Sequence, residues 1–191
     1  MFKGIAFAAL AAAFLMGANT PSESAQKVRF NFTSESAAKK SRYKGKKVVN
    51  YRTSHAPGTI VISTGKRKLY LVMADGKAME YGVGVGRQGF SWAGGARIAR
   101  KAKWPAWRPP AAMREREPHL PEYMEGGPKN PLGARALYLY QGKVDTLYRI
   151  HGTSQPHTIG LAVSSGCIRM LNEEVIDLYQ RVKIGARVVV N

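Results

Sequence analysis

Short runs of β-branched and aromatic residues, separated by turn residues, fill much of the chain from Pro57 onward. Runs of this kind, bounded by glycine-containing turns at residues 65–67 and 74–77, predict β-strands joined by hairpins. About six such strands, mostly joined by tight turns, predict a single β-rich domain. The runs cover residues 58–64, 68–73, 79–86, 136–140, 146–152 and 186–191.

One helix is predicted near the end of the chain. Asn172 is the expected N-cap, and the glutamates at 173 and 174 suit the positive end of the helix dipole. Lys183 and Gly185 are expected to end the helix. An apolar stripe at helical spacing defines its buried face. The stripe consists of Val175, Leu178, Tyr179 and Val182.

The segment between Gln88 and Leu132 has little periodicity and is rich in tryptophan, proline and arginine. Long irregular segments in compact domains are usually functional, so we expect an insertion or lid beside the functional site. Its tryptophans, Trp92, Trp104 and Trp107, either line a groove or pack in the core, and the sequence leaves both uses open.

The first residues predict export. A positively charged start is followed by an uncharged, mostly apolar run at residues 4–18 and then by a polar stretch. This layout is typical of a cleaved signal peptide, whereas a transmembrane anchor needs about 20 apolar residues. We therefore expect a signal peptide at residues 1–25, a periplasmic mature protein and no transmembrane segment in the mature chain.

The formal net charge of the chain is +18. Residues 26–55 hold nine lysines and arginines against a single acidic residue, Glu35. Because this stretch also lacks apolar periodicity, we expect a flexible basic arm over residues 26–56 and one domain over residues 57–191. Such a charge favours polyanionic partners, which for an exported protein are cell-wall polymer, anionic lipid or acidic peptide rather than nucleic acid.

Cys167 is the only cysteine of the chain. Exported proteins that use cysteine structurally use it in pairs, so this thiol is either a buried apolar group or a reactive one. A thiol with a pKa of about 8.5 is mostly protonated at neutral pH, so a nucleophilic cysteine needs a base. His151, at the end of a predicted strand, is the candidate base.

The residues next to Cys167 suit nucleophilic catalysis. Gly166 allows a sharp turn that would aim backbone amides at a developing oxyanion. Arg169 is placed to bind a carboxylate through both arms of its guanidinium. The residues therefore favour nucleophilic catalysis by Cys167 with His151 as its base.

Two other kinds of site have partial patterns in the sequence. A zinc site formed by His151, His157 and Cys167 stays open, although the chain has no HExxH motif and no paired cysteines. The glycine-rich stretch at residues 82–89 has the wrong spacing for a dinucleotide-binding fingerprint, and no helical pattern follows it. A glycine-rich strand is the better interpretation of that stretch.

Taken together, these segments resemble the L,D-transpeptidase catalytic domain of the YkuD type. The resemblance rests on "IHGT" at residues 150–153, "SSGCIRM" at residues 164–170 and the helix that follows. Further likeness lies in "GTIVIST", "LYLV", "GGPKNPLGARALYLY" and "VKIGARVVV", and it extends over roughly residues 57–191. The resemblance implies a mainly β, sandwich-like or barrel-like domain with one or two short helices, in an exported enzyme that acts on peptidoglycan.

The same resemblance implies a mechanism. Cys167 would attack the carbonyl of the third residue of a stem tetrapeptide, release D-alanine and form a thioester. An amine of a second stem, or of an outer-membrane protein or lipoprotein, would then accept the acyl group. His151 would act as general base and acid, Ser164 would orient it, and the amides of Gly166 and Cys167 would bind the oxyanion. The expected substrate-binding residues are Arg169, Gly152, Thr153 and Ser165.

Two departures from the family pattern are visible. Ser165 stands where members commonly carry histidine, and "FSWAGGARI" replaces a common Thr-Pro-x-Gly turn. No cofactor and no metal are expected. Two alternative functions stay open: an L,D-carboxypeptidase or hydrolase that gives the same thioester to water, and a non-catalytic cationic protein that binds the cell wall.

Overall fold

The computed structural model describes residues 43–191 of the chain. The predicted signal peptide and most of the predicted basic arm lie outside these residues. Within the described part of the chain, no helix is long and apolar enough to cross a membrane.

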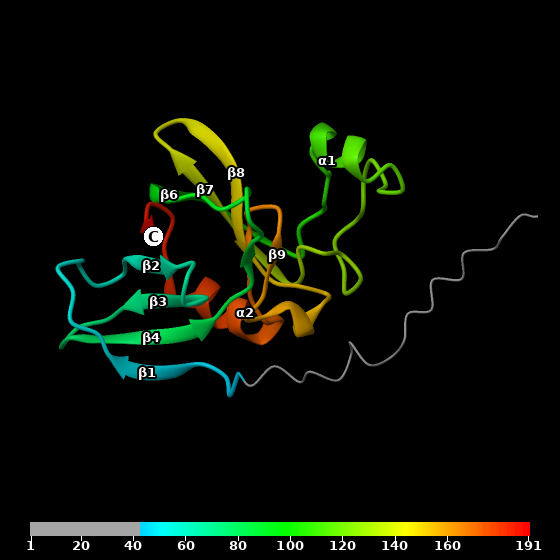
Figure 1. The fold of residues 1–191 in the computed structure, drawn as a ribbon. Coiled ribbons are helices and arrows are strands. Elements are labelled where there is room, and N and C mark those ends of the chain that lie inside the picture. The colour runs from blue at the N-terminus through cyan, green and yellow to red at the C-terminus, as the bar shows by residue number, and fades with distance from the viewer. Residues whose placement is uncertain (1–42) are drawn as a thin grey trace, which may run out of the picture. The chain divides into compact units, whose positions relative to one another are not determined.

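A nine-stranded mixed sheet dominates the structure (Figure 1), with strand order β1-β4-β3-β2-β11-β6-β7-β8-β10. Its strands are β1 (Lys47–Asn50), β2 (Ile60–Ser63), β3 (Lys68–Val72), β4 (Lys77–Gly82), β6 (Gly94–Lys103), β7 (Arg135–Gln141), β8 (Val144–His151), β10 (Ile168–Arg169) and β11 (Arg187–Val190). A small second sheet pairs β5 (Val85–Gly86) with β9 (Ala162–Ser164). The helices are α1 (Ala111–Arg116) and α2 (Asn172–Arg181), and a 3-10 turn spans Pro156–Thr158.

The prediction of a mainly β domain with one or two short helices is confirmed. Each predicted strand is present, and the hairpin at residues 58–73 pairs in antiparallel register with Ile60 opposite Leu71. The sheet does not close into a barrel within the described residues, because β1 and β10 form its two edges.

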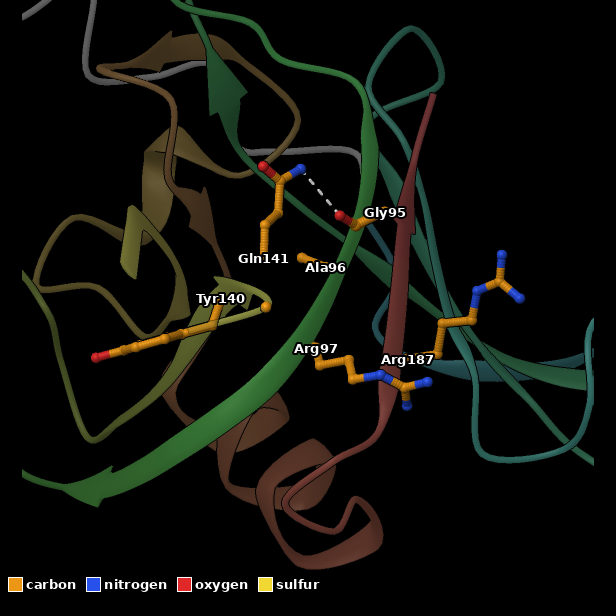
Figure 2. Close-up of a pocket in the computed structure, with 7 residues that line it drawn as sticks. Gly95, Ala96, Arg97, Tyr140, Gln141 and Arg187 are labelled. Atoms are coloured by element: carbon orange, nitrogen blue, oxygen red, sulfur yellow. Dashed lines mark hydrogen bonds between the residues drawn. The ribbon is translucent and has the colours of Figure 1, made fainter. Parts of the chain in front are cut away.

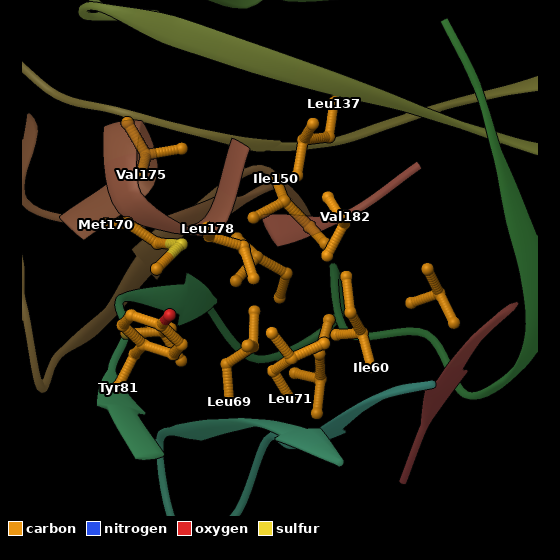
Figure 3. Packing of buried hydrophobic residues seen from close by; sticks show 14 of the residues in the cluster. Ile60, Leu69, Leu71, Tyr81, Leu137, Ile150, Met170, Val175, Leu178 and Val182 are labelled. Atoms are coloured by element: carbon orange, nitrogen blue, oxygen red, sulfur yellow. The ribbon is translucent and has the colours of Figure 1, made fainter. Parts of the chain in front are cut away.

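Strand β11 joins two groups of strands, β1-β4-β3-β2 on one side and β6-β7-β8-β10 on the other. The hydrophobic core lies between these two groups. Figure 3 shows Leu178 of α2 between Ile150 on one side and Leu69 on the other, and Val175 of the same helix belongs to the same cluster. All four side chains are fully buried, and each contributes about 1.5–3 kcal/mol through removal of its apolar surface from water. The predicted apolar stripe of the helix is therefore the face that packs on the sheet.

The segment between Gln88 and Leu132 is less irregular than the sequence predicts. Residues 94–103 form β6, a long strand that pairs with β11 on one side and β7 on the other. The prediction missed this strand because only Ala96 and Ile98 of its first half face the core, so the sequence shows no apolar run. Helix α1 and the connections around it make up the remainder of the segment.

The flexible arm predicted for residues 26–56 ends earlier than expected. Residues 47–50 form β1, which adds to the edge of the sheet beside β4. Two side-chain contacts fasten the preceding residues to α2: the Tyr43 hydroxyl donates to Glu174 at 2.7 Å, and Lys46 pairs with Asp177 at 2.6 Å. The prediction failed here because lysines on an exposed edge strand hide its pairing pattern.

Candidate active site

Cys167 and His151 are brought together by two neighbouring parallel strands. Strand β10 pairs with β8 so that Ile168 lies opposite Ile150 and Arg169 lies opposite His151. Both isoleucines are buried in the core. Because side chains alternate along a strand, Cys167, Arg169 and His151 project toward the opposite face of the sheet. Neighbouring strands lie about 4.8 Å apart, so this register places the thiol beside the histidine-bearing strand.

The tautomer of His151 is set by its neighbour in the chain. The ring is buried, with 4% of its surface exposed, and its Nδ1 lies 2.6 Å from the carbonyl oxygen of Gly152. A carbonyl only accepts hydrogen bonds, so Nδ1 carries the proton and Nε2 carries the lone pair. The imidazole is therefore held in the form that a general base requires.

The surroundings keep His151 uncharged. Burial lowers the pKa of His151 to about 4, and the positive charges of Arg169 and Arg149 act in the same direction. Burial raises the pKa of the Cys167 thiol, while the backbone N–H of Arg149 and the two arginine charges oppose that rise. At neutral pH the site thus holds a neutral thiol and a neutral imidazole. The positive charges of Arg149 and Arg169 favour the thiolate form of Cys167.

Ser164 braces the loop that carries the cysteine. Its hydroxyl donates to the carbonyl oxygen of Cys167 at 2.6 Å and accepts from the amide of Gly166 at 3.2 Å. These contacts hold the backbone around Cys167, while the predicted role of Ser164 in orienting His151 stays a prediction. The Gly166 amide already donates to the Ser164 hydroxyl. Of the two amides expected to bind the oxyanion, the Cys167 amide is therefore the one that this contact does not use.

Gly166 is required by the geometry of this loop. Its φ is +108°, in the region that L-residues rarely adopt. A Cβ at this position would collide with the ring of Tyr148 and approach the carbonyl oxygen of Phe90. The glycine therefore allows the cysteine loop to pass directly over β8.

Arg169 is held by the backbone as well as by its position beside His151. Its amide and carbonyl exchange hydrogen bonds with Gly84, both at 2.9 Å. The guanidinium lies 3.4 Å from Oε1 of Gln155, and burial lowers the pKa of Arg169. The contacts support an electrostatic effect on the site, and the predicted binding of a substrate carboxylate stays a prediction.

Asn172 has a different task from the predicted one. Helix α2 begins after Leu171, and its N-cap has no side-chain hydrogen bond. The Asn172 carboxamide instead accepts from Ala134 N at 2.9 Å and Thr153 N at 3.2 Å, and it donates to Thr153 O at 3.0 Å. It thereby fixes the chain that follows His151. Helix capping could explain an asparagine at this place in the sequence, so the sequence offered no signal for this role.

The other predicted site residues support the same region. Gly152 has no room for a Cβ, which would collide with Oδ1 of Asn172. Thr153 is buried and its backbone is bound by that asparagine. Ser165 is half-buried in the loop beside the cysteine. These positions shape the site, while their contact with substrate stays a prediction.

The tryptophans left open by the sequence separate into different roles. Trp92 stacks on Tyr148, with ring centroids 4.8 Å apart and planes at 10°, and Tyr148 in turn lies under the cysteine loop. Trp107 pairs through its backbone with Met124, and Trp104 is exposed. Trp92 is therefore the tryptophan that packs beside the site.

Sequence reasoning missed an irregularity in β8 next to the thiol. The register with β7 shifts between Tyr138 and Tyr140, and Leu147 has a φ of +61°. The carbonyl oxygen of Leu147 lies 3.8 Å from Sγ of Cys167. Asp145 stabilises this conformation by accepting from the Leu147 amide at 2.9 Å. An aspartate that bonds the backbone two residues later is a known turn signal, and it was the available clue.

No metal-binding cluster of three histidine, cysteine or acidic side chains is present within residues 43–191. His157 of the zinc alternative is exposed in the 3-10 turn, whereas His151 is buried.

Comparison with known proteins identifies the fold family. The family model described as the L,D-transpeptidase catalytic domain, YkuD, matches residues 57–190. The probable L,D-transpeptidase ErfK/SrfK of Escherichia coli K12 is 36% identical over 138 residues, which are 68% of this chain and 42% of that protein. The chain thus spans less than half the length of that relative.

Two solved structures share the fold. A crystal structure of a probable carnitine operon oxidoreductase from Brucella melitensis is 50% identical, with a TM-score of 0.54, over 78% of this chain and 94% of that one. An L,D-transpeptidase from Mycobacterium smegmatis has a TM-score of 0.53 over 71% of this chain and 59% of that one, at 16% identity. With the family match and the placement of Cys167 and His151, these likenesses show that the chain belongs to the L,D-transpeptidase catalytic domain family.

Proposed function

We propose that this protein is a cysteine-dependent L,D-transpeptidase of peptidoglycan. The observation that carries the proposal is the parallel pairing of β8 with β10, in which Arg169 lies opposite His151 and Cys167 comes two residues before Arg169. The tautomer of His151 leaves Nε2 as a base. Membership of the family supports the choice of peptidoglycan stem peptides as the substrate class.

In the first half of the reaction, Sγ of Cys167 attacks the carbonyl of the third residue of a stem tetrapeptide. The thiol proton passes to Nε2 of His151, and the oxyanion is met by the Cys167 amide. The bond to the terminal D-alanine then breaks, and the imidazolium gives its proton to the leaving amine. A thioester between Cys167 and the acyl group remains.

In the second half, an acceptor amine attacks the thioester. His151 takes a proton from the amine, the carbon–sulfur bond breaks, and the proton returns to the thiol. The products are a new amide bond and the original enzyme. The low pKa of His151, about 4, keeps the base unprotonated before each attack.

The description of the Brucella relative as an oxidoreductase suggests another reaction class, and the residues of this chain do not favour it. The glycine-rich stretch at residues 82–89 contains the short strand β5, which pairs with β9. A dinucleotide fingerprint would open a helix at that point. The cysteine and histidine arrangement instead supports acyl transfer.

The protein is proposed to act in the periplasm, after removal of a signal peptide at residues 1–25. The basic arm would then be the part of the chain that attracts anionic polymers. Its predicted extent is revised to residues before β1, because residues 47–50 belong to the sheet.

The proposal is tested with purified mature protein, a disaccharide-tetrapeptide and mass spectrometry. We expect release of D-alanine together with 3-3 dimers, and no release by the Cys167→Ala variant. Tripeptide without dimers would identify an L,D-carboxypeptidase. Equal release by Cys167→Ala would overturn the role of the cysteine. No release by the unaltered protein would leave the alternative of a cationic wall-binding protein.

A further inference from the structure

The face of the sheet that carries Cys167 also carries a row of cationic and aromatic side chains. Side chains directly opposite one another on paired strands point to the same face. Arg149 of β8 lies opposite Tyr138 of β7, and Tyr138 lies opposite Arg100 of β6. Since Cys167 directly precedes β10 and Ile168 lies opposite Ile150, the thiol continues this row.

A second row runs beside the first on the same face. Tyr140 of β7 lies opposite Arg97 of β6, and Arg97 lies opposite Arg187 of β11. We call the four arginines of the two rows the arginine strip. The arginine strip consists of Arg149, Arg100, Arg97 and Arg187.

The part of the strip nearest the thiol is preorganised by stacking. The guanidinium carbon of Arg100 lies 3.4 Å from the ring centroid of Tyr138, and that of Arg149 lies 4.4 Å from it. Tyr138 is only 7% exposed although it faces away from the core. Stacking fixes the planes of the guanidinium groups, so little side-chain entropy is lost when one of them binds a carboxylate.

Most of the strip's charge is not neutralised. Asp145 pairs with Arg149 at 2.7 Å, but none of the ion pairs among residues 43–191 includes Arg97, Arg100 or Arg187. Arg97 donates to the carbonyl oxygen of Gly185 at 2.9 Å and remains exposed. Like charges directly opposite one another on a sheet are destabilising, and Arg97 lies opposite Arg187. A bound anion would therefore reduce the repulsion between these two guanidinium groups.

The far end of the strip opens into a shallow pocket. Figure 2 shows Arg97, Arg187, Tyr140 and Gln141 around it, and the hollow has a volume of about 430 Å³. Gln141 is tied to the carbonyl oxygen of Gly95 at 3.0 Å, which holds the rim in place. The strip therefore leads from the thiol toward a recess that Arg97 and Arg187 make positively charged.

The distance between the Cys167 thiol and Arg100 limits which ligands can contact both groups. Three strand spacings separate Cys167 from Arg100, which is about 14 Å. An extended peptide covers this distance with about four residues. The peptide part of a stem attacked at its third residue does not cover this distance, because only two residues precede the reacting carbonyl and one follows it.

We propose that the arginine strip binds the carboxylates of an acidic polypeptide acceptor, with Arg100 as its main anchor. The inference rests on the proposed acyl transfer and specifies the acceptor. The amine of the acceptor reacts with the thioester at Cys167, and acidic side chains about four residues along the chain meet Arg100. Planar carboxylates match the guanidinium fork, and they make the acceptor complementary to the charge of the strip.

Binding is measured by fluorescence anisotropy on the Cys167→Ala protein, which retains the strip and cannot transfer an acyl group. The probes are two labelled peptides of equal length, one with aspartate and glutamate near the fourth residue and one with asparagine and glutamine there. We expect the acidic peptide to bind about tenfold more tightly, and Arg100→Ala and Arg100→Gln in this background to abolish the preference. Arg52→Ala, which removes an exposed arginine near β1, should leave the preference intact.

Three outcomes would overturn the inference: equal affinity for the two peptides, an unchanged preference in both Arg100 variants, or a preference lost equally in Arg52→Ala. Displacement of the acidic peptide by short polyphosphate at the same concentration as by unlabelled peptide would point to a general polyanion site and also overturn it. Because no acyl transfer is needed for binding, failure of the proposed function would appear separately, as absent D-alanine release by the unaltered protein.

Discussion

At the scale of single residues, the Gly152 carbonyl and Arg169 control the tautomer and the charge of His151. The Gly152 carbonyl fixes the tautomer of His151, and burial together with Arg169 keeps the imidazole neutral. The sign of this effect is definite, since a positive charge beside an imidazole disfavours its protonated form. Arg169 is thus a positioning and electrostatic residue whose influence should be visible in the pH dependence of the reaction.

The acid limb of the pH profile is the first prediction. Because the pKa of His151 is lowered to about 4, D-alanine release should persist well below the ordinary histidine pKa of about 6.5. Arg169→Met removes a positive charge, raises the pKa of His151 and should move the acid limb toward neutral pH. Arg169→Lys keeps the charge and should move it less. An unaltered protein that loses activity around pH 6.5, or a limb that is the same in all three proteins, would contradict this.

The second prediction separates backbone strain from collision at Gly166. Gly166→Ala places a Cβ against Tyr148 at a φ of +108°, whereas Gly160→Ala meets nothing within 4 Å at a φ of +87°. Urea unfolding should show a loss of about 1 kcal/mol for Gly160→Ala from φ strain, and a further loss of about 1–3 kcal/mol for Gly166→Ala from overpacking. Equal losses in the two variants would show that the loop has room for a side chain.

At the scale of elements, the regular hairpins and α2 were predictable from the sequence, and β6 and β1 were not. Helix α2 carries apolar residues at helical spacing because one of its faces is buried, and β2 is a continuous apolar run because Ile60, Val61 and Ile62 are all buried. The exposed face of β6 carries Arg97 and Arg100 in place of apolar residues, and β1 lies at an edge. Cys167 and His151 were found through residue chemistry, whereas the role of Asn172 depends on contacts between segments distant in sequence.

Asn172→Ala provides the third prediction. Loss of an ordinary N-cap costs about 1 kcal/mol, but this side chain serves two amides and one carbonyl, so we expect a loss of about 2–3 kcal/mol in the free energy of unfolding. D-alanine release should fall as well, because the chain after His151 loses its anchor. Glu173→Ala, the neighbouring change in the first turn, should cost no more than about 1 kcal/mol. Similar losses in both variants would indicate a helix-capping role only.

At the scale of the whole molecule, β11 joins the two groups of strands. It pairs in parallel with β2 and antiparallel with β6, so the last strand in sequence lies at the centre of the sheet. Val188 is fully buried where the two groups meet. The hydrophobic core also draws on both groups and on α2 (Figure 3), so residues 57–190 should unfold as one unit.

The fourth prediction tests this cooperativity. Val188→Ala should lower the free energy of unfolding by about 2 kcal/mol through the cavity it leaves. Within each of the two proteins, tryptophan fluorescence, which reports on Trp92, Trp104 and Trp107, and far-ultraviolet circular dichroism, which reports on the sheet, should give the same transition midpoint. Separate midpoints for the two probes would show that the surroundings of the tryptophans unfold independently of the sheet.

The central claim is that Cys167 forms a thioester with a stem peptide, and intact-protein mass spectrometry tests it most directly. Mature protein is mixed with disaccharide-tetrapeptide, quenched in acid before a second tetrapeptide accepts the acyl group, and weighed. We expect a mass gain equal to the donor minus D-alanine, located by digestion on the peptide containing Cys167, and no gain in Cys167→Ala. D-alanine release without this adduct, or an adduct that persists in Cys167→Ala, would contradict it.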